Sequence, residues 1–103
     1  MEAETTAVEQ IAAIRGREWA AENSALIIDV REPHEWAMGT LPGAELIRLN
    51  DLPARLSHLD RDRPALIVCR TGNRSNAAAA FMARNGFGRV ANLRGGLFAL
   101  GLA

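Results

Sequence analysis

The chain has 103 residues, of which 49% are hydrophobic, and this size and composition predict one globular domain over residues 1–103. Twelve basic residues, all of them arginine, balance twelve acidic residues, and a net charge of zero argues against a general binder of nucleic acid or of anionic membranes. No apolar run approaches the roughly 20 residues that span a bilayer, and the acidic start lacks a signal pattern, so we expect a cytoplasmic protein.

The N-terminal segment predicts a helix. Thr5 or Thr6 can cap it, and three apolar residues spaced three apart form its core face: Val8, Ile11 and Ile14. The sequence leaves open a short strand ahead of this helix. A further helical turn is expected over residues 19–21, where Trp19 would fill a place in the core.

The first clear strand covers residues 26–30, which are apolar on both faces except for Asp29, as expected for a buried parallel strand. Pro33 suits the first position of a short helix, with Glu35 in its first turn. Ligand sites of open α/β sheets gather at the carboxyl ends of strands, where Asp29 and Arg31 lie. For these two residues we favour an internal ion pair or a cap that holds the turn.

A turn over residues 39–44 leads into a short strand over 45–49 and then into a helix that begins at Asn50 or Asp51. Three leucines give that helix a core face: Leu52, Leu56 and Leu59.

The second half of the chain is expected to continue as strand, helix and strand. The strand covers residues 65–69, Ser75 or Asn76 caps the helix, and a last strand covers 89–93. Strands that alternate with helices at these spacings indicate a three-layer α/β domain with a mainly parallel sheet. An apolar piece over 97–102 ends the chain without a polar tail, which indicates a truncated chain or a domain cut from a longer protein.

The chain contains one cysteine and two histidines. Cys69 cannot form an internal disulfide, so it is either buried and inert or reactive. His34 and His58 lack any ligand spacing, so we expect both on the surface and predict neither a metal site nor a cofactor.

The stretch between the 65–69 strand and the following helix carries the chemistry. It reads Cys69-Arg70-Thr71-Gly72-Asn73-Arg74-Ser75. A thiolate is the nucleophilic form of cysteine, and helix N-termini and nearby cations favour that form. If the loop wraps inward, which Gly72 allows, the amides of residues 71–75 form a nest for an anion. Such a site suits attack on a phosphate ester, or on a sulfane sulfur to leave a persulfide.

The length of this loop favours the second chemistry. Cysteine-dependent phosphatases place one residue more between cysteine and arginine than the four that separate Cys69 from Arg74. The tighter ring fits a single terminal sulfur better than a phosphoryl group.

This loop resembles the active-site loop of the rhodanese (thiosulfate sulfurtransferase) family. Residues 29–36 resemble the family's N-terminal signature, residues 39–44 its glycine–proline turn, and residues 92–96 its last strand and turn. The match runs from about residue 26 to residue 96. One departure is Thr40, where many members have histidine, and we expect little effect on sulfur transfer because this residue is not the nucleophile. The other is a short C-terminus, which lacks a segment that usually packs under the sheet.

The resemblance implies a single rhodanese-like domain with a five-stranded parallel sheet between helices. It implies that Cys69 carries the persulfide and that Asp29 and Arg31 support the structure near the loop. The substrate-binding residues that it implies are Arg70, Thr71, Gly72, Asn73, Arg74 and Ser75. Their amides would stabilise the outer sulfur, and Arg70 and Arg74 would attract a small anionic donor.

The implied activity moves a sulfane sulfur from thiosulfate or a related donor to cyanide or a thiol acceptor. A second hypothesis is a relay that takes a persulfide from a partner and passes it to a protein acceptor, or a unit that only docks. A third is a phosphatase or arsenate reductase on the same fold, which the loop length disfavours. None of these readings involves nucleic acid or a membrane.

Overall fold

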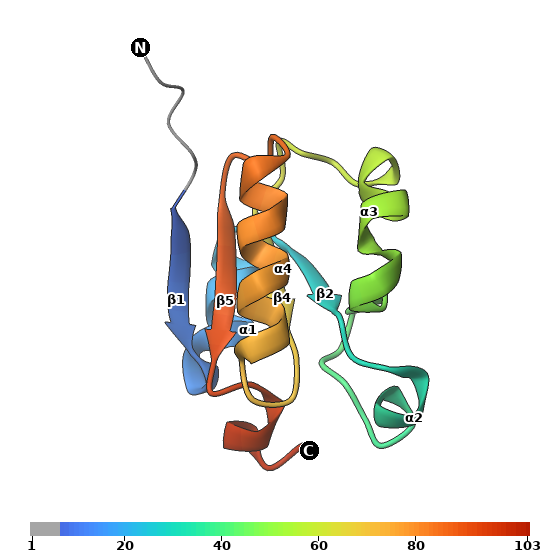
Figure 1. Cartoon of the computed structure of the whole chain (residues 1–103). Coiled ribbons are helices and arrows are strands. Elements are labelled where there is room, and N and C mark those ends of the chain that lie inside the picture. Colours follow the sequence, from blue (N-terminus) through green and yellow to red (C-terminus); the bar gives the residue numbers. More distant parts are fainter. Residues whose placement is uncertain (1–6) are drawn as a thin grey trace.

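The structure is a computed structural model and describes residues 7–103. Its five strands form one parallel sheet in the order β1-β5-β4-β2-β3 (Figure 1). The strands are β1 (Val8–Ala12), β2 (Leu26–Asp29), β3 (Glu45–Leu46), β4 (Ala65–Val68) and β5 (Val90–Arg94). The α-helices are α1 (Gly16–Glu22), α2 (Pro33–Trp36), α3 (Leu52–Arg55) and α4 (Asn73–Arg84). Four 3-10 segments complete the set: η1 (Ala13–Arg15), η2 (Leu49–Asp51), η3 (Leu56–His58) and η4 (Leu97–Leu100).

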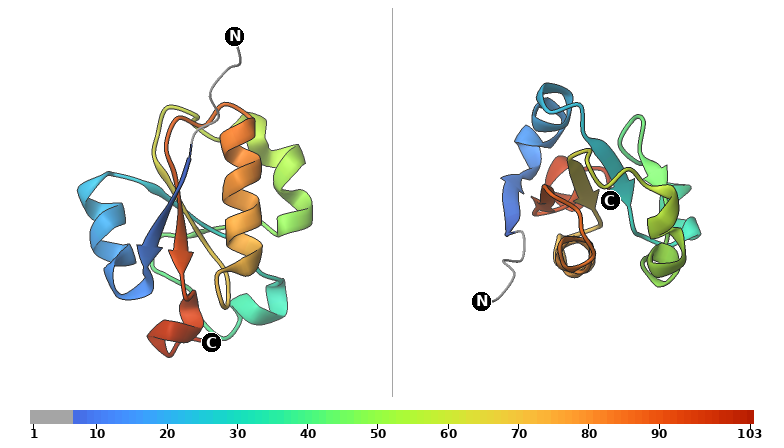
Figure 2. Two further views of the ribbon diagram at one scale, coloured as in Figure 1. Left: turned by 60° about the vertical axis from the view of Figure 1, so that its left-hand side comes forward. Right: turned by 90° about the horizontal axis from the view of Figure 1, so that it is seen from above.

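The sheet separates two hydrophobic cores. Helices α3 and α4 cover one face, and α1 covers the other (Figure 2). The central strand β4 is fully buried and supplies both cores, since Ala65 and Ile67 point to the α3–α4 side and Leu66 and Val68 to the α1 side. The expected three-layer α/β architecture with a five-stranded parallel sheet is confirmed.

The predicted N-terminal helix is wrong. Residues 8–12 form β1 and pair with β5 from Val8 opposite Val90 to Ala12 opposite Arg94, and Ile14 is 85% exposed instead of lying on a core face. The open edge of β5 supplies hydrogen-bond partners that a local pattern cannot reveal, so tertiary pairing overrides the three-residue spacing. Thr5 and Thr6, the expected caps, lie outside the described residues.

Other element boundaries also differ from the prediction. The strand expected over 45–49 ends at Leu46, and the chain enters η2 at Leu49, one residue before the expected helix start. Helix α4 begins at Asn73 after Gly72, so Ser75 and Asn76 lie inside its first turn and do not cap it. Gly72 has a φ of 100°, a left-handed conformation that turns the chain into the helix without a side-chain cap. Within residues 7–103, none of the helices is both long and apolar enough to span a bilayer.

Candidate active site

Cys69 follows β4 directly, at the carboxyl end of the central strand. The loop from Cys69 to Gly72 then leads into α4, and it lies at the same end of the molecule as α2 and η4 (Figure 1). The thiol is almost completely buried, with Cys69 only 1% exposed. Burial alone would suit an inert cysteine, so the contacts of its sulfur decide what it can do.

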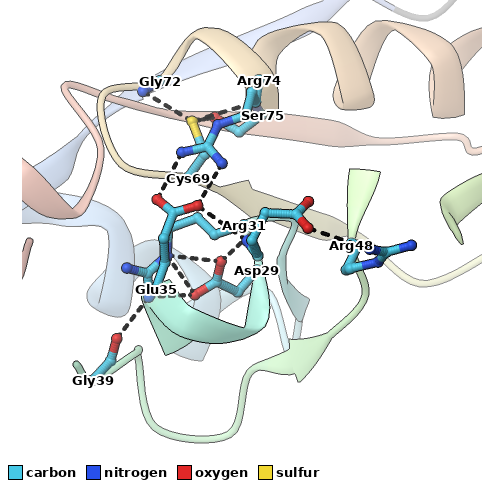
Figure 3. Close-up of polar contacts among 10 residues, drawn as sticks. Asp29, Arg31, Glu35, Gly39, Arg48, Cys69, Gly72, Arg74 and Ser75 are labelled. Carbon is cyan, nitrogen blue, oxygen red and sulfur yellow. Dashed lines mark hydrogen bonds and ion pairs between the residues drawn. The ribbon is translucent and has the colours of Figure 1, made fainter. Parts of the chain in front are cut away.

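Two backbone N–H groups donate hydrogen bonds to the Sγ atom of Cys69 (Figure 3): that of Gly72 lies 3.1 Å from Sγ and that of Ser75 lies 3.3 Å from it. The Ser75 hydroxyl oxygen lies 3.2 Å from Sγ and is also within hydrogen-bond distance of it. Ser75 belongs to the first turn of α4, a helix of 12 residues whose positive end therefore faces the sulfur. Hydrogen-bond donors and a helix N-terminus are the surroundings in which nucleophilic cysteines occur, whereas an inert cysteine is packed among apolar groups. Of the amides expected over residues 71–75, these two reach the sulfur.

The outer side of the loop is held by η4. The N–H of Leu97 donates to the Cys69 carbonyl at 3.0 Å, and the N–H of Phe98 donates to the Arg70 carbonyl at 2.8 Å. Gly96 lies so close to the loop that an added Cβ would clash with the Arg70 carbonyl and come within 2.7 Å of the Thr71 nitrogen. The sequence of residues 97–102 predicts only an apolar end, although the Gly95-Gly96 pair before it is a signal of close backbone approach.

Arg74 forms a two-pronged ion pair with Glu35 of α2. Its Nη1 lies 2.7 Å from Glu35 Oε1 and its Nη2 2.9 Å from Oε2 (Figure 3). The hydrogen bonds from Arg74 are the largest cause that lowers the pKa of Glu35 from 4.5 to about 2, while the same pair raises the pKa of Arg74. The ion pair fixes the loop to α2 from the side opposite to η4. Sequence reasoning did not identify Glu35 as a site residue because its partner lies 39 positions away.

The remaining loop side chains face outward. Arg70 is exposed, and its guanidinium stacks over the ring of Phe98 with 5.2 Å from Cζ to the ring centroid. Thr71 and Asn73 are exposed and line a polar cavity of about 300 Å³. The other residues around this cavity are Gln10, Gly72, Asn76, Asn92, Arg94 and Gly95.

Asp29 and Arg31 form a buried ion pair, with 0% and 1% exposure, in which Arg31 Nη2 lies 2.8 Å from Asp29 Oδ2 (Figure 3). The same Nη2 donates to the Gly39 carbonyl at 2.6 Å, and the Thr40 hydroxyl donates to Asp29 Oδ2 at 2.6 Å. The pair therefore connects the end of β2 to the turn that follows α2. The Asp29–Arg31 pair thus helps to hold α2 in place. Because α2 carries Glu35, the pair supports the helix to which Arg74 is bound.

Both histidines are exposed. In the described part of the chain, no three His, Cys, Asp or Glu side chains are grouped so that they could hold a metal ion.

Comparison with known proteins gives one consistent result. The family model of the rhodanese-like domain matches residues 13–102. A sulfurtransferase of Allochromatium vinosum is 43% identical over 74 residues, which cover 72% of this chain and 69% of the relative. The thiosulfate sulfurtransferase GlpE of Ectopseudomonas mendocina is 36% identical over 74 residues, 72% of this chain and 68% of the relative. The crystal structure of a rhodanese-like domain protein from Staphylococcus aureus superposes with a TM-score of 0.81 at 30% identity, covering 89% of this chain and 90% of the other.

Proposed function

Because the chain belongs to the family of rhodanese-like domains, and because similar proteins of this family are named sulfurtransferases, we propose that it is a rhodanese-type sulfurtransferase in which Cys69 carries the sulfur. The donor is thiosulfate or a related compound, and the acceptor is cyanide or a thiol. The observation that carries this proposal is the sulfur of Cys69 held by the amides of Gly72 and Ser75 at the N-terminus of α4. A nucleophile in that position is stabilised as an anion and needs no metal or cofactor to react.

In the first half-reaction the Cys69 thiolate attacks the outer sulfur of thiosulfate. The bond between that sulfur and the sulfonate group breaks, and sulfite leaves with the electron pair. The product is a persulfide whose outer sulfur carries the negative charge. Exposed Arg70 at the rim of the loop supports the approach of a small dianion, because a cation close to the nucleophile raises the local concentration of its substrate.

In the second half-reaction cyanide or a thiolate attacks the outer sulfur. The S–S bond breaks, its electron pair returns to Sγ, and thiocyanate or a new persulfide leaves. The two loop amides and the helix N-terminus then stabilise the returning thiolate as they did before the cycle began. The acceptor thiol can belong to a small molecule or to a protein.

Thiocyanate production from thiosulfate and cyanide tests the activity. Wild type should turn over, and Cys69→Ser, which keeps a group of similar size in the loop, should fall to the background rate. Equal background rates for both proteins would contradict the proposal. Hydrolysis of an aryl phosphate by wild type but not by Cys69→Ser would instead indicate the phosphatase chemistry that the loop length disfavours.

Mass spectrometry after thiosulfate treatment tests the intermediate separately. We expect a gain of one sulfur mass on a peptide that contains Cys69, reversed by cyanide. A gain that cyanide does not reverse but a protein thiol does would indicate a relay with a protein acceptor. No gain at all would mean that the domain does not carry sulfur.

A further inference from the structure

A chain of hydrogen bonds leads from the sulfur of Cys69 to the surface. The Ser75 hydroxyl, 3.2 Å from Sγ, donates to Asn92 Oδ1 at 2.5 Å. Asn92 Nδ2 donates to Gln10 Oε1 at 2.9 Å, and Gln10 Nε2 donates to Asn76 Oδ1 at 2.8 Å. Ser75 and Asn92 are 0% and 3% exposed, whereas Gln10 and Asn76 are exposed. The buried sulfur site is thus connected to β5, β1 and α4 through side chains that carry no charge.

The direction of these hydrogen bonds is fixed because each side-chain amide has an NH₂ group that donates and a carbonyl oxygen that accepts. Asn92 uses its NH₂ group on Gln10, so its carbonyl oxygen faces Ser75. The Ser75 hydroxyl has one hydrogen, and that hydrogen goes to Asn92. A neutral thiol can then donate its own hydrogen to Ser75 Oγ. A thiolate has no hydrogen to give, so the bond that Sγ can gain from Ser75 competes with the bond to Asn92.

We propose that Asn92 is a positioning residue that sets the reactivity of Cys69 through the Ser75 hydroxyl. The inference rests on the proposed function, in which Sγ is neutral in the persulfide and becomes an anion when the acceptor breaks the S–S bond. While Sγ is neutral, Asn92 holds the hydroxyl hydrogen. As the electron pair returns to Sγ, the hydrogen turns from Asn92 towards the sulfur. The strength of Asn92 as an acceptor therefore tunes how easily Cys69 becomes a thiolate and how readily it leaves the persulfide.

Charged groups also act on Cys69 from the elements packed around it, and any test must hold them constant. They are Arg70 in the loop, Arg74 on α4 with its partner Glu35 on α2, the Asp29–Arg31 pair at the end of β2, and Arg94 at the end of β5. An Asn92→Leu substitution changes none of these charges and approximately conserves side-chain volume. It removes the donor to Gln10, which is exposed to water, and the acceptor of the Ser75 hydroxyl, which can then turn to Sγ.

The rate of Cys69 alkylation by iodoacetamide as a function of pH measures thiolate formation without any sulfur transfer. Asn92→Leu releases the Ser75 hydroxyl to Sγ, so the midpoint of its profile should lie about one pH unit below that of wild type, the size of one hydrogen bond to a charged group. In a Ser75→Ala background the same substitution should leave the midpoint unchanged, because the hydroxyl that transmits the effect is gone.

Asn92→Asp provides the opposite change, since a carboxylate accepts the Ser75 hydrogen more strongly. Its midpoint should rise, and the rise should shrink in the Ser75→Ala background. This variant keeps the test decisive if Asn92→Leu does not fold, as judged by circular dichroism. Three results would overturn the inference: an unchanged midpoint for folded Asn92→Leu, a downward shift of that variant that persists in the Ser75→Ala background, or an Asn92→Asp rise that does not shrink in that background. Since alkylation needs only the thiol, each of these results leaves the thiocyanate assay to judge the proposed function on its own.

Discussion

At the scale of single residues, the structure distinguishes the two loop arginines that were expected to attract the donor, because only Arg74 forms an ion pair with α2. Its guanidinium is paired with Glu35 through two short hydrogen bonds, so much of its charge is compensated at close range. Arg70 remains as the exposed loop arginine, stacked on Phe98. We therefore expect the two arginines to have different roles, with Arg74 fixing the loop to α2 and Arg70 meeting the donor.

Replacing Glu35 by glutamine tests the structural role of this ion pair. We expect the free energy of unfolding at pH 7 to fall by about 1 kcal/mol, a modest value because the Arg74 side chain is 36% exposed and solvent screens the pair. The measurement is urea denaturation followed by circular dichroism. Glu45→Gln serves as a control, since it removes an exposed carboxylate on β3 for which residues 7–103 provide no ion pair.

The loss of unfolding free energy in Glu35→Gln should depend on pH over a defined interval. The pKa of Glu35 is about 2 in the folded protein against an ordinary 4.5, so the folded state binds fewer protons than the unfolded state between these values. The stabilisation by the carboxylate is complete above about pH 4.5 and is lost as the pH falls towards 2. Wild type and Glu35→Gln should therefore converge in stability over this range. A constant difference from pH 7 to pH 2 would show that the ionised carboxylate is not its source.

At the scale of elements, η4 has more effect on the site than its short length suggests. It donates two backbone hydrogen bonds to the carbonyls of Cys69 and Arg70, and Gly96 before it touches the loop backbone. The curvature of the loop around the sulfur thus depends on a segment that follows the last strand. The two sides of the loop are held independently, by η4 on one side and by α2 through Glu35 on the other.

Substituting Gly96 by alanine should displace the loop. Gly96 has a φ of 63° with ψ of −167°, a conformation that essentially only glycine adopts, and a Cβ there would also clash with the Arg70 carbonyl. We expect at least a tenfold loss of thiocyanate production and a loss of stability of about 3 kcal/mol. Gly101→Ala is the control, since Gly101 also has a left-handed φ, 73°, but nothing lies within 4 Å of an added Cβ. Equal effects of the two substitutions would mean that contact with the loop is unimportant.

At the scale of the whole molecule, a set of contacts remote from the chemistry holds the opposite end of the sheet together. Arg89 precedes β5 at the end far from Cys69. It bonds Glu9 of β1 at 2.7 Å and Asn23 after α1 at 2.6 Å, and it stacks over Trp19 at 5.2 Å. One side chain therefore connects the start of β5 to β1 and to the C-terminal end of α1.

Arg89→Ala should cost about 1 kcal/mol of unfolding free energy, because its ion pair is exposed but its stacking is not screened. Thiocyanate production per folded molecule should stay unchanged. Arg84→Ala removes another exposed arginine, on α4, and should change neither quantity. Urea denaturation at low and high salt separates the two contributions of Arg89, since salt weakens only the ion pair. A loss of sulfur transfer in Arg89→Ala would contradict this division of the molecule.

Sequence patterns predicted the features of this fold that are local. The buried apolar runs at 26–30 and 65–69 predicted strands β2 and β4 to within one residue. The stretch from Cys69 to Ser75 predicted the position of the turn between β4 and α4. The missed features depend on residues far apart in the chain. Strand β1 forms because residues 8–12 pair with β5. Glu35 belongs to the site because Arg74 donates hydrogen bonds to it, and Asn92 belongs to it because it accepts the hydrogen of the Ser75 hydroxyl. No local periodicity encodes such a contact.

The pairing of β1 with β5 also has a consequence for synthesis on the ribosome. Translation delivers β1 first, but Val8 pairs with Val90, so the first strand emerges long before its partner. Strands β2 and β4 can pair while the C-terminal part of the chain is still being made. The segment that fastens the sulfur loop, η4, follows β5 and therefore leaves the exit tunnel after all five strands of the sheet. A nascent chain should therefore stay unreactive at Cys69 until η4 has left the exit tunnel and can hold the loop.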